Sequence, residues 1–243
     1  ATLGLAVVLA LKSATAIPRP AVTPVDPAGL PVVLESFVAG EIESDGFAFP
    51  SGHATAATVV YGGLGLLLSV GRKRFRYLLA AGMIVLISFS RVVLDVHYLR
   101  DILAGMVLGS LLIAVGLAVG RDDGRFHPDR IFALGGVASV VGLAVALQGG
   151  HGEEVLQAAI GIGTAIGGIV TWRRFGDRLL AAPPVSIPLA VAGLAVAGGL
   201  WIAAYAGLLP AVGAVVASAV AVGTILLLPL LAERRQKNEK PTA

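Results

Sequence analysis

Long apolar runs constrain this chain more than any other feature of its sequence. Seven runs of about 16 to 22 residues carry almost no charge. That is close to the length an α-helix needs to cross a hydrocarbon core about 30 Å thick. With 56% hydrophobic and only 14% charged residues, the chain is more apolar than a soluble domain of this size needs. We therefore predict an all-α, polytopic transmembrane helical bundle. Its expected spans are Thr55–Val70, Tyr77–Val93, Ile102–Val119, Ile131–Leu147, Leu156–Trp172, Ile187–Leu208 and Ala211–Leu231.

A shorter apolar run, Ala1–Leu11, precedes these seven. A helix of that length rises only about 16 Å, which is too short to span the membrane. The chain begins with Ala rather than Met, so we expect missing upstream sequence and interpret the run as a truncated first helix. A second interpretation is the hydrophobic part of a signal peptide, because the small residues Ala14, Thr15 and Ala16 follow it.

The basic residues divide unequally between loops that alternate across the membrane. All but four of the 18 lysines and arginines fall on one side, which the positive-inside rule makes cytoplasmic. They are Arg72, Lys73, Arg74, Arg76, Arg121, Arg125, Arg130, Arg173, Arg174, Arg178, Arg234, Arg235, Lys237 and Lys240. The other side holds Lys12, Arg19, Arg91 and Arg100, and topology does not explain these four. Because the bases are scattered between helices, the net charge of +3 does not indicate nucleic-acid binding.

Two clusters of polar residues lie early on the predicted external side. The first is Lys12-x6-Arg19-Pro20, which follows the short first run; a lone lysine at a helix end is also a common interfacial anchor. The second is Pro50-Ser51-Gly52-His53, directly before the helix expected from Thr55. Proline and serine at that place are ordinary helix-start residues. Yet a helix start also offers backbone N–H groups and the positive end of the helix dipole, which suit a phosphate.

A third cluster, Ser90-Arg91-x5-His97-x3-Asp101, bridges the end of one expected helix and the start of the next. If this segment is helical, His97 and Asp101 share a face. A carboxylate that accepts one ring N–H leaves the other ring nitrogen as a nucleophile. The alternatives are a merely hydrogen-bonded interfacial histidine and a simple helix-start charge at Asp101.

In this order, the three clusters resemble the three-part signature of the type 2 phosphatidic acid phosphatase superfamily, in its membrane-associated lipid phosphatase branch. The superfamily also includes vanadium haloperoxidases and glucose-6-phosphatase. The resemblance implies that His97 attacks phosphorus and forms a phosphohistidine, with Asp101 orienting the ring. His53 would protonate the leaving oxygen and then activate water. The phosphate-holding positions it implies are Lys12, Arg19, Ser51, the backbone N–H of Gly52, and Arg91.

The resemblance implies a phosphatase acting on a phosphomonoester or diphosphate of a lipid, such as phosphatidic acid, phosphatidylglycerophosphate or a polyprenyl diphosphate. The protein would be integral to the cell membrane, with its active site on the extracytoplasmic face and membrane lipid as a further partner. We expect no metal and no cofactor, because cationic side chains supply the positive charge and a chain with four histidines and no cysteine is a poor ligand set. The alternatives are a vanadate-dependent haloperoxidase-like enzyme and a non-catalytic membrane transporter or scaffold.

Three regions follow from these expectations. Residues 1–119 would form the phosphatase core, residues 120–232 additional transmembrane helices of unknown role, and residues 233–243 a cytoplasmic polar tail. The additional helices are rich in small residues that permit close packing, so a scaffold or an oligomer interface is expected there, with the oligomeric state open. Between Ser13 and Pro50 we expect a lid or binding loop, with a short amphipathic or re-entrant element at Pro31–Ala39. Arg100 would contact the substrate or pair with an acid.

Overall fold

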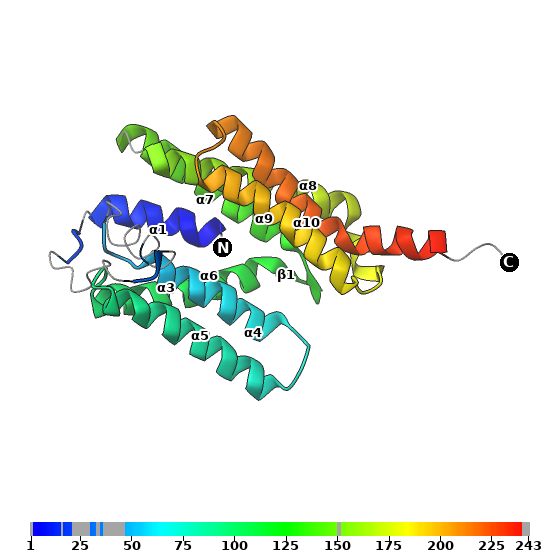
Figure 1. The fold of residues 1–243 in the computed structure, drawn as a ribbon, viewed down its shortest axis with the longest axis horizontal. Helices are drawn as coiled ribbons and strands as arrows, with labels where there is room; N and C mark the ends of the chain where they lie inside the picture. The colour runs from blue at the N-terminus through cyan, green and yellow to red at the C-terminus, as the bar shows by residue number, and fades with distance from the viewer. Residues whose placement is uncertain are drawn as a thin grey trace. The chain divides into compact units, whose positions relative to one another are not determined.

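The computed structural model describes residues 2–15, 17–20, 30–32, 35, 47–149 and 152–239. It forms two compact units, Leu3–Leu117 and Ala118–Ala243, which we call the first and second unit and describe separately. Helices dominate both (Figure 1). Among the described residues, six helices are long and apolar enough to cross a membrane. The prediction of an all-α polytopic membrane protein is confirmed.

The first unit is built from α-helices and one π-helical segment. They are α1 (Thr2–Thr15), α3 (Gly52–Ala57), η1 (Thr58–Gly62), α4 (Gly63–Leu67), α5 (Lys73–Val93) and α6 (Leu99–Gly120, whose last residues belong to the second unit). The consecutive segments α3, η1 and α4 run along α5, to which α4 is joined by a short loop (Figure 1). In α1, Val8 is buried and lies near Gly52. The apolar start of the chain is therefore part of the packing of this unit.

The helix expected at Thr55–Val70 is present, but it starts earlier and is not uniform. Its middle segment, η1, is π-helical. The hydroxyls of Thr55 and Thr58 donate to the carbonyls of Ser51 and Ala54, at 2.9 and 2.8 Å. Such hydroxyls compete with the backbone for helix carbonyls and bend helices, and the π segment begins at Thr58 itself. The α3–η1–α4 helix ends at Leu67, so it is shorter than the six spans.

Two glycines of α6 let it approach the start of α3 closely. A Cβ at Gly105 would lie 2.6 Å from the carbonyl oxygen of Ser51, and one at Gly109 would lie 2.6 Å from the Cβ of Thr58. Glycines four residues apart on one helix face are a common means of bringing two membrane helices together. This contact sets the distance between the segment that carries Ser51 and the helix that carries Asp101.

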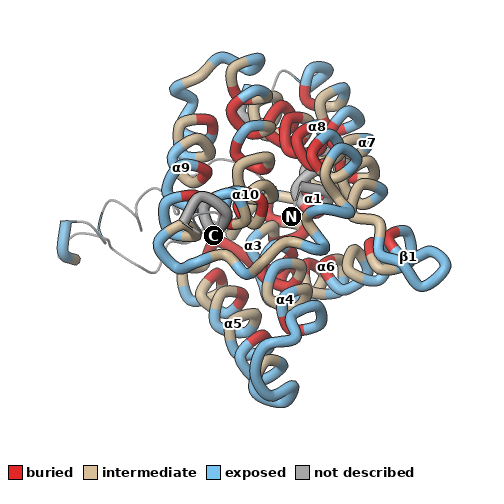
Figure 2. Tube along the Cα trace, turned by 90° about the vertical axis from the view of Figure 1, so that its right-hand side faces the viewer, coloured by how far each residue is buried: buried red, intermediate tan, exposed pale blue. Residues whose placement is uncertain are grey.

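The second unit contains a short ribbon of β1 (Arg121–Asp122) and β2 (Arg125–Phe126), followed by four helices. These are α7 (Pro128–Gly149), α8 (Gly152–Ala181), α9 (Ile187–Tyr205) and α10 (Ala211–Glu239). The most buried of the spans is α8 (Figure 2). In this helix, 56% of the most apolar stretch is buried. Its Gly163 and Gly167 meet the backbone of Val215 and Ala219 in α10. The expected small-residue packing is therefore found here.

Several helices continue beyond the apolar runs that predicted them. Helix α8 runs to Ala181 and α10 to Glu239, so residues 233–239 of the expected tail are helical. Apolar runs mark the part of a helix that lies in lipid, whereas the helix ends where its backbone hydrogen bonds end. Of the element expected at Pro31–Ala39, only Pro31, Val32 and Glu35 are described, with the Glu35 N–H donating to the carbonyl of Pro31 at 2.9 Å. The rest of it, and most of the loop around it, lie outside the described residues.

The close approach at Gly105 gives a test of the packing of the first unit. We expect Gly105→Ala to lower the thermal unfolding midpoint in detergent, because the added methyl must displace backbone of the Ser51 turn, at a cost of about 1–3 kcal/mol. Gly116→Ala on the same helix is the control, since nothing lies within 4 Å of a Cβ there. Equal midpoints for the two variants would contradict this account.

Candidate active site

Two hydrogen bonds hold the first cluster beside the second. Lys12 lies in the last turn of α1, and in that turn the Thr15 hydroxyl donates to the carbonyl of Phe49 at 3.2 Å. A few residues later, the Ala48 N–H donates to the carbonyl of Ile17 at 2.8 Å. The segments that lead to Arg19 and to Ser51 therefore run next to each other.

The second cluster is tied to the third through the backbone. The N–H of Ser51 donates to the carbonyl of Asp101 at 2.9 Å. Ser51 is also the N-cap of α3, where its hydroxyl oxygen accepts from the N–H of Ala54 at 3.4 Å, and its side chain is completely buried. The capping role expected for Ser51 is present, and at the same place the start of α3 is fixed against the start of α6.

The spacing between Arg91 and His97 is set by the way α5 ends. Asp95 has a left-handed backbone conformation, with φ 55°. The N–H of Asp95 donates to the carbonyl of Val92, and that of Val96 donates to the carbonyl of Arg91. This pair of bonds is the Schellman arrangement that closes a helix. This turn reverses the direction of the chain within a few residues, so that His97 lies directly after it.

Within the same turn, Ser90 orients Arg91. The hydroxyl of Ser90 donates to the carbonyl of Ile87 at 2.8 Å and accepts from Nε of Arg91 at 3.2 Å. The Arg91 side chain is only 7% exposed. Its guanidinium is therefore held from the Nε side, and this explains why a serine precedes the arginine.

Asp101 lies at the first turn of α6 and serves both the helix and the histidine. Its Oδ2 accepts from the backbone N–H of Tyr98 at 2.9 Å, which satisfies a donor that the helix itself leaves unpaired. The same oxygen lies 3.7 Å from Nδ1 of His97, and among the described residues this nitrogen has no hydrogen-bond partner. Closing the distance to about 3.0 Å would form a hydrogen bond. Apo active sites often tighten in this way when substrate binds.

His97 lies in a buried and positively charged environment. Its side chain is 3% exposed and that of Asp101 is 0% exposed. The pKa of His97 is lowered from 6.5 to about 3. Burial is the largest cause, and the charges of Lys12, Arg19 and His53 contribute in the same direction. The carbonyl of Ala48 has the opposite, smaller effect. At neutral pH the ring is therefore neutral and keeps the lone pair that a nucleophile needs.

The expected site residues fall into a buried group and a more accessible group. Ser51, Arg91, His97 and Asp101 are buried, whereas Lys12, Arg19 and Gly52 are half-buried and His53 is exposed. Electrostatic effects join Lys12, Arg19 and His53 to His97, and the contacts above join Ser51 to Asp101. The buried histidine is therefore near two half-buried cations, Lys12 and Arg19, which could attract an anion. In the part of the chain that the structure describes, no three His, Cys, Asp or Glu residues could hold a metal ion together.

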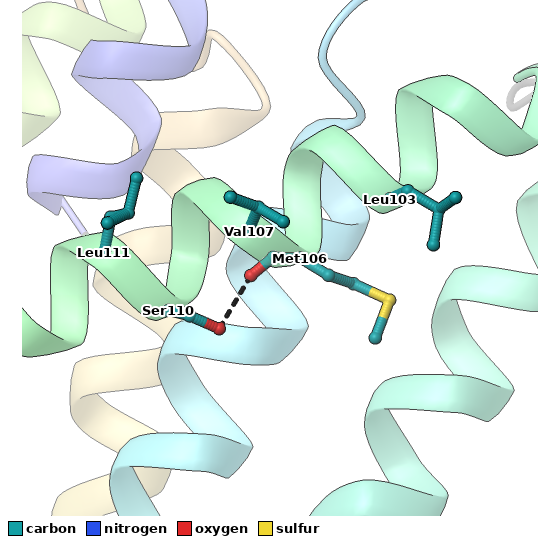
Figure 3. A pocket seen from close by; sticks show the side chains of 5 residues that line it. All are labelled: Leu103, Met106, Val107, Ser110 and Leu111. Carbon is teal, nitrogen blue, oxygen red and sulfur yellow. Dashed lines mark hydrogen bonds between the residues drawn. The ribbon is translucent and has the colours of Figure 1, made fainter.

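An apolar hollow lies on α6, beginning two residues after Asp101 and on the opposite face of the helix. It is lined by Leu103, Met106, Val107, Ser110 and Leu111, which lie in a row along the helix (Figure 3). The hydroxyl of Ser110 donates to the carbonyl of Met106 at 2.9 Å, so the polar atom in the row is already bonded. This face of α6 is thus suited to contact with hydrocarbon.

Sequence reasoning missed three contributors to this site. The Gly105-x3-Gly109 spacing was a readable signal of close helix packing. The role of the Tyr98 N–H was not readable, because a capping box is recognised by a serine or threonine at the N-cap, and tyrosine stands here. The bonds made by Ala48 and Thr15 join residues more than 30 positions apart, so no local pattern could indicate them.

The neutral state of His97 predicts a pH dependence of stability. As the pH falls below 6.5, the unfolded chain binds a proton at this residue while the folded protein does not until about pH 3. The free energy of unfolding should therefore fall in this window, by up to about 1.4 kcal/mol per pH unit. We expect the unfolding midpoint of His97→Asn to drop less than that of the wild type between pH 7.5 and 5.5. Parallel curves would contradict a buried neutral histidine.

Comparison with known proteins identifies the family of this chain. Phosphatidylglycerophosphatase B of Bacillus subtilis (strain 168) is 36% identical to the chain over 77 residues, which are 29% of this chain and 38% of that protein. The match thus covers well under two thirds of that relative. No solved structure matches the chain. The family model of the PAP2 superfamily matches residues 1–125, a stretch that contains all three clusters and about half of the sequence. The chain therefore belongs to the PAP2 superfamily.

Proposed function

We propose that this protein is a membrane phosphatase that hydrolyses a phosphomonoester or diphosphate of a lipid through a phosphohistidine. One observation carries the proposal: His97 is buried and neutral, lies beside the Asp101 carboxylate, and is surrounded by the charges of Lys12 and Arg19. A neutral imidazole facing an anion-binding group of cations is the arrangement that attack on a phosphate requires. Membership of the PAP2 superfamily and the similarity to phosphatidylglycerophosphatase B support it.

In the first step, Nε2 of His97 attacks phosphorus while the bond from phosphorus to the lipid oxygen breaks. Asp101 lies on the Nδ1 side of the ring and stabilises the positive charge that develops there. The accessible His53 gives its proton to the departing oxygen. Lys12, Arg19 and Arg91, with Ser51 and the Gly52 N–H, hold the non-bridging oxygens, whose charge is redistributed in the transition state.

In the second step, His53 has lost its proton and accepts one from water. The resulting hydroxide attacks phosphorus, the phosphorus–nitrogen bond breaks, and inorganic phosphate leaves. His97 is neutral again and His53 is again protonated, so the cycle closes without net proton uptake by the enzyme. The positive charge comes from side chains in both steps, and we propose that the reaction is independent of metal.

A lipid substrate fits the position of the site on the helices. His97 and Asp101 lie at the junction of α5 and α6, where two spans reach the membrane surface. On α6, large apolar side chains such as Leu103 and Val107 are exposed, so a substrate could place its phosphate at His97 while its tail stays in the surrounding lipid. Phosphatidic acid, phosphatidylglycerophosphate and polyprenyl diphosphates all have this form.

The site would open on the extracytoplasmic face. The basic residues 72–76 precede or begin α5, and the site lies at the other end of this helix of 21 residues, about 30 Å away. Since basic loops stay in the cytoplasm, the opposite end faces outward. We assign the phosphatase activity to residues 1–119, and to residues 120–232 a supporting role as further membrane helices, with the tail from 233 on the cytoplasmic side.

The phosphohistidine can be trapped by slowing its hydrolysis. With 4-nitrophenyl phosphate, whose leaving group needs no proton, we expect His53→Asn to complete the first step and accumulate an acid-labile, alkali-stable phosphoenzyme detectable with ³²P. His97→Asn should form none and should lose at least about 10³-fold in phosphate release. Wild-type-like turnover by His97→Asn, with an unchanged unfolding midpoint at pH 7.5, would overturn the mechanism. Halide oxidation with added vanadate, without phosphatase activity, would favour a haloperoxidase.

The role of Asp101 can be separated from the loss of a loop charge. We expect Asp101→Asn to lower kcat by about 10²-fold or more, because an amide cannot stabilise the imidazolium that develops at His97. Asp95→Asn is the matched control: it removes a nearby carboxylate, from the turn that ends α5, and asparagine tolerates the left-handed backbone found there. Equal effects of the two substitutions would show that only the net charge of the turn matters.

A further inference from the structure

Arg100 is the one base on the site side that the three-part signature leaves without a role. It follows His97 by three residues and precedes Asp101. The positive-inside rule disfavours a base on this side, and three of the four bases there are already explained by phosphate binding. Arg100 therefore needs a separate explanation.

The contacts of Arg100 place its guanidinium beside Asp101 and Tyr98. Its Nε lies 3.6 Å from Oδ1 of Asp101, on the carboxylate oxygen that does not face His97. Its guanidinium carbon lies 4.8 Å from the ring centre of Tyr98, a distance typical of a cation–π contact. The ring acts as a platform that holds the guanidinium near Asp101.

Pairing with Asp101 alone does not account for this arrangement. The separation of 3.6 Å exceeds hydrogen-bond distance, and Oδ1 of Asp101 has no hydrogen-bond partner among the described residues. The Arg100 side chain is 64% exposed, so its Coulomb attraction to Asp101 is screened by water and contributes little. Most of its five N–H donors can still bind an anion, and a planar guanidinium binds phosphate through two parallel hydrogen bonds.

We propose that Arg100, supported by Tyr98, binds a second phosphate group of the substrate, next to the phosphate that His97 attacks. This inference rests on the proposed function and narrows its substrate class. The substrate would carry two phosphates, either linked directly as a diphosphate or separated as a phosphomonoester and a phosphodiester. A lipid with a single phosphate would leave Arg100 without an anion to bind.

The test compares substrates with one and two phosphates on the purified full chain in mixed micelles. Phosphatidic acid has one phosphate, whereas phosphatidylglycerophosphate and a polyprenyl diphosphate each have two, in the two possible arrangements. For the wild type we expect a higher kcat/KM for at least one of the two-phosphate lipids. In Arg100→Gln this preference should fall about 10- to 100-fold, mainly through KM. Arg100→Lys should lie between, because lysine keeps the charge but loses the planar fork.

Two controls separate substrate contact from other roles of an exposed arginine. Arg130→Gln removes another exposed arginine paired with an aspartate, Asp122, and should leave the rates and the preference unchanged. Tyr98→Leu should reduce the preference more than Tyr98→Phe, which keeps the aromatic platform.

Several outcomes would overturn the inference. An equal loss on all three lipids in Arg100→Gln would mean that Arg100 acts through Asp101. An unchanged preference would mean that it only anchors the protein among lipid head groups, and a wild type that prefers phosphatidic acid would also exclude a second-phosphate contact. In these cases the phosphatase proposal stands. A wild type that releases phosphate from none of the three lipids would overturn both.

Discussion

The buried carboxylate of Asp101 is the interaction on which the rest of the site depends. Asp101 joins three parts of the chain. The backbone carbonyl of Asp101 accepts from the Ser51 N–H. The Oδ2 atom of Asp101 accepts from the Tyr98 N–H and faces Nδ1 of His97. A fully buried charge is costly unless neighbouring donors compensate it. The Tyr98 N–H at the start of α6 is one such donor, and the Ser51 bond fixes the start of α6 against that of α3.

A second constraint is the balance between burial and positive charge around His97. Burial, the larger effect, and the nearby charges of Lys12 and Arg19 both disfavour protonation of His97. The site is thus prepared for an anion and keeps its histidine neutral at the same time. In the mechanism we propose, the negative charge of a bound phosphate offsets the cations and eases the positive charge that develops on the ring during attack.

Much of the fold and of the site composition could be predicted from the sequence. The apolar runs predicted the membrane helices because the bilayer requires about 20 apolar residues per span, and the three clusters indicated which residues would gather. The π-helical turn at Thr58 and the end of α8 at Ala181 could not be predicted, because they depend on competition among backbone bonds and not on hydropathy. Nor was the Schellman turn at Asp95 foreseen, since aspartate enters the left-handed region less readily than glycine.

By itself, the sequence determined that the chain crosses a membrane, which end of each helix is polar, and which residue types could handle a phosphate. Those properties follow from the composition of short segments, which act locally. Only the tertiary structure decided that the Ser51 turn meets the start of α6 through Gly105, that His97 is buried, and that Arg100 lies on the far side of the Asp101 carboxylate. Such features arise from contacts between segments distant in the chain, and their energies depend on separations of a few ångströms that no local pattern encodes.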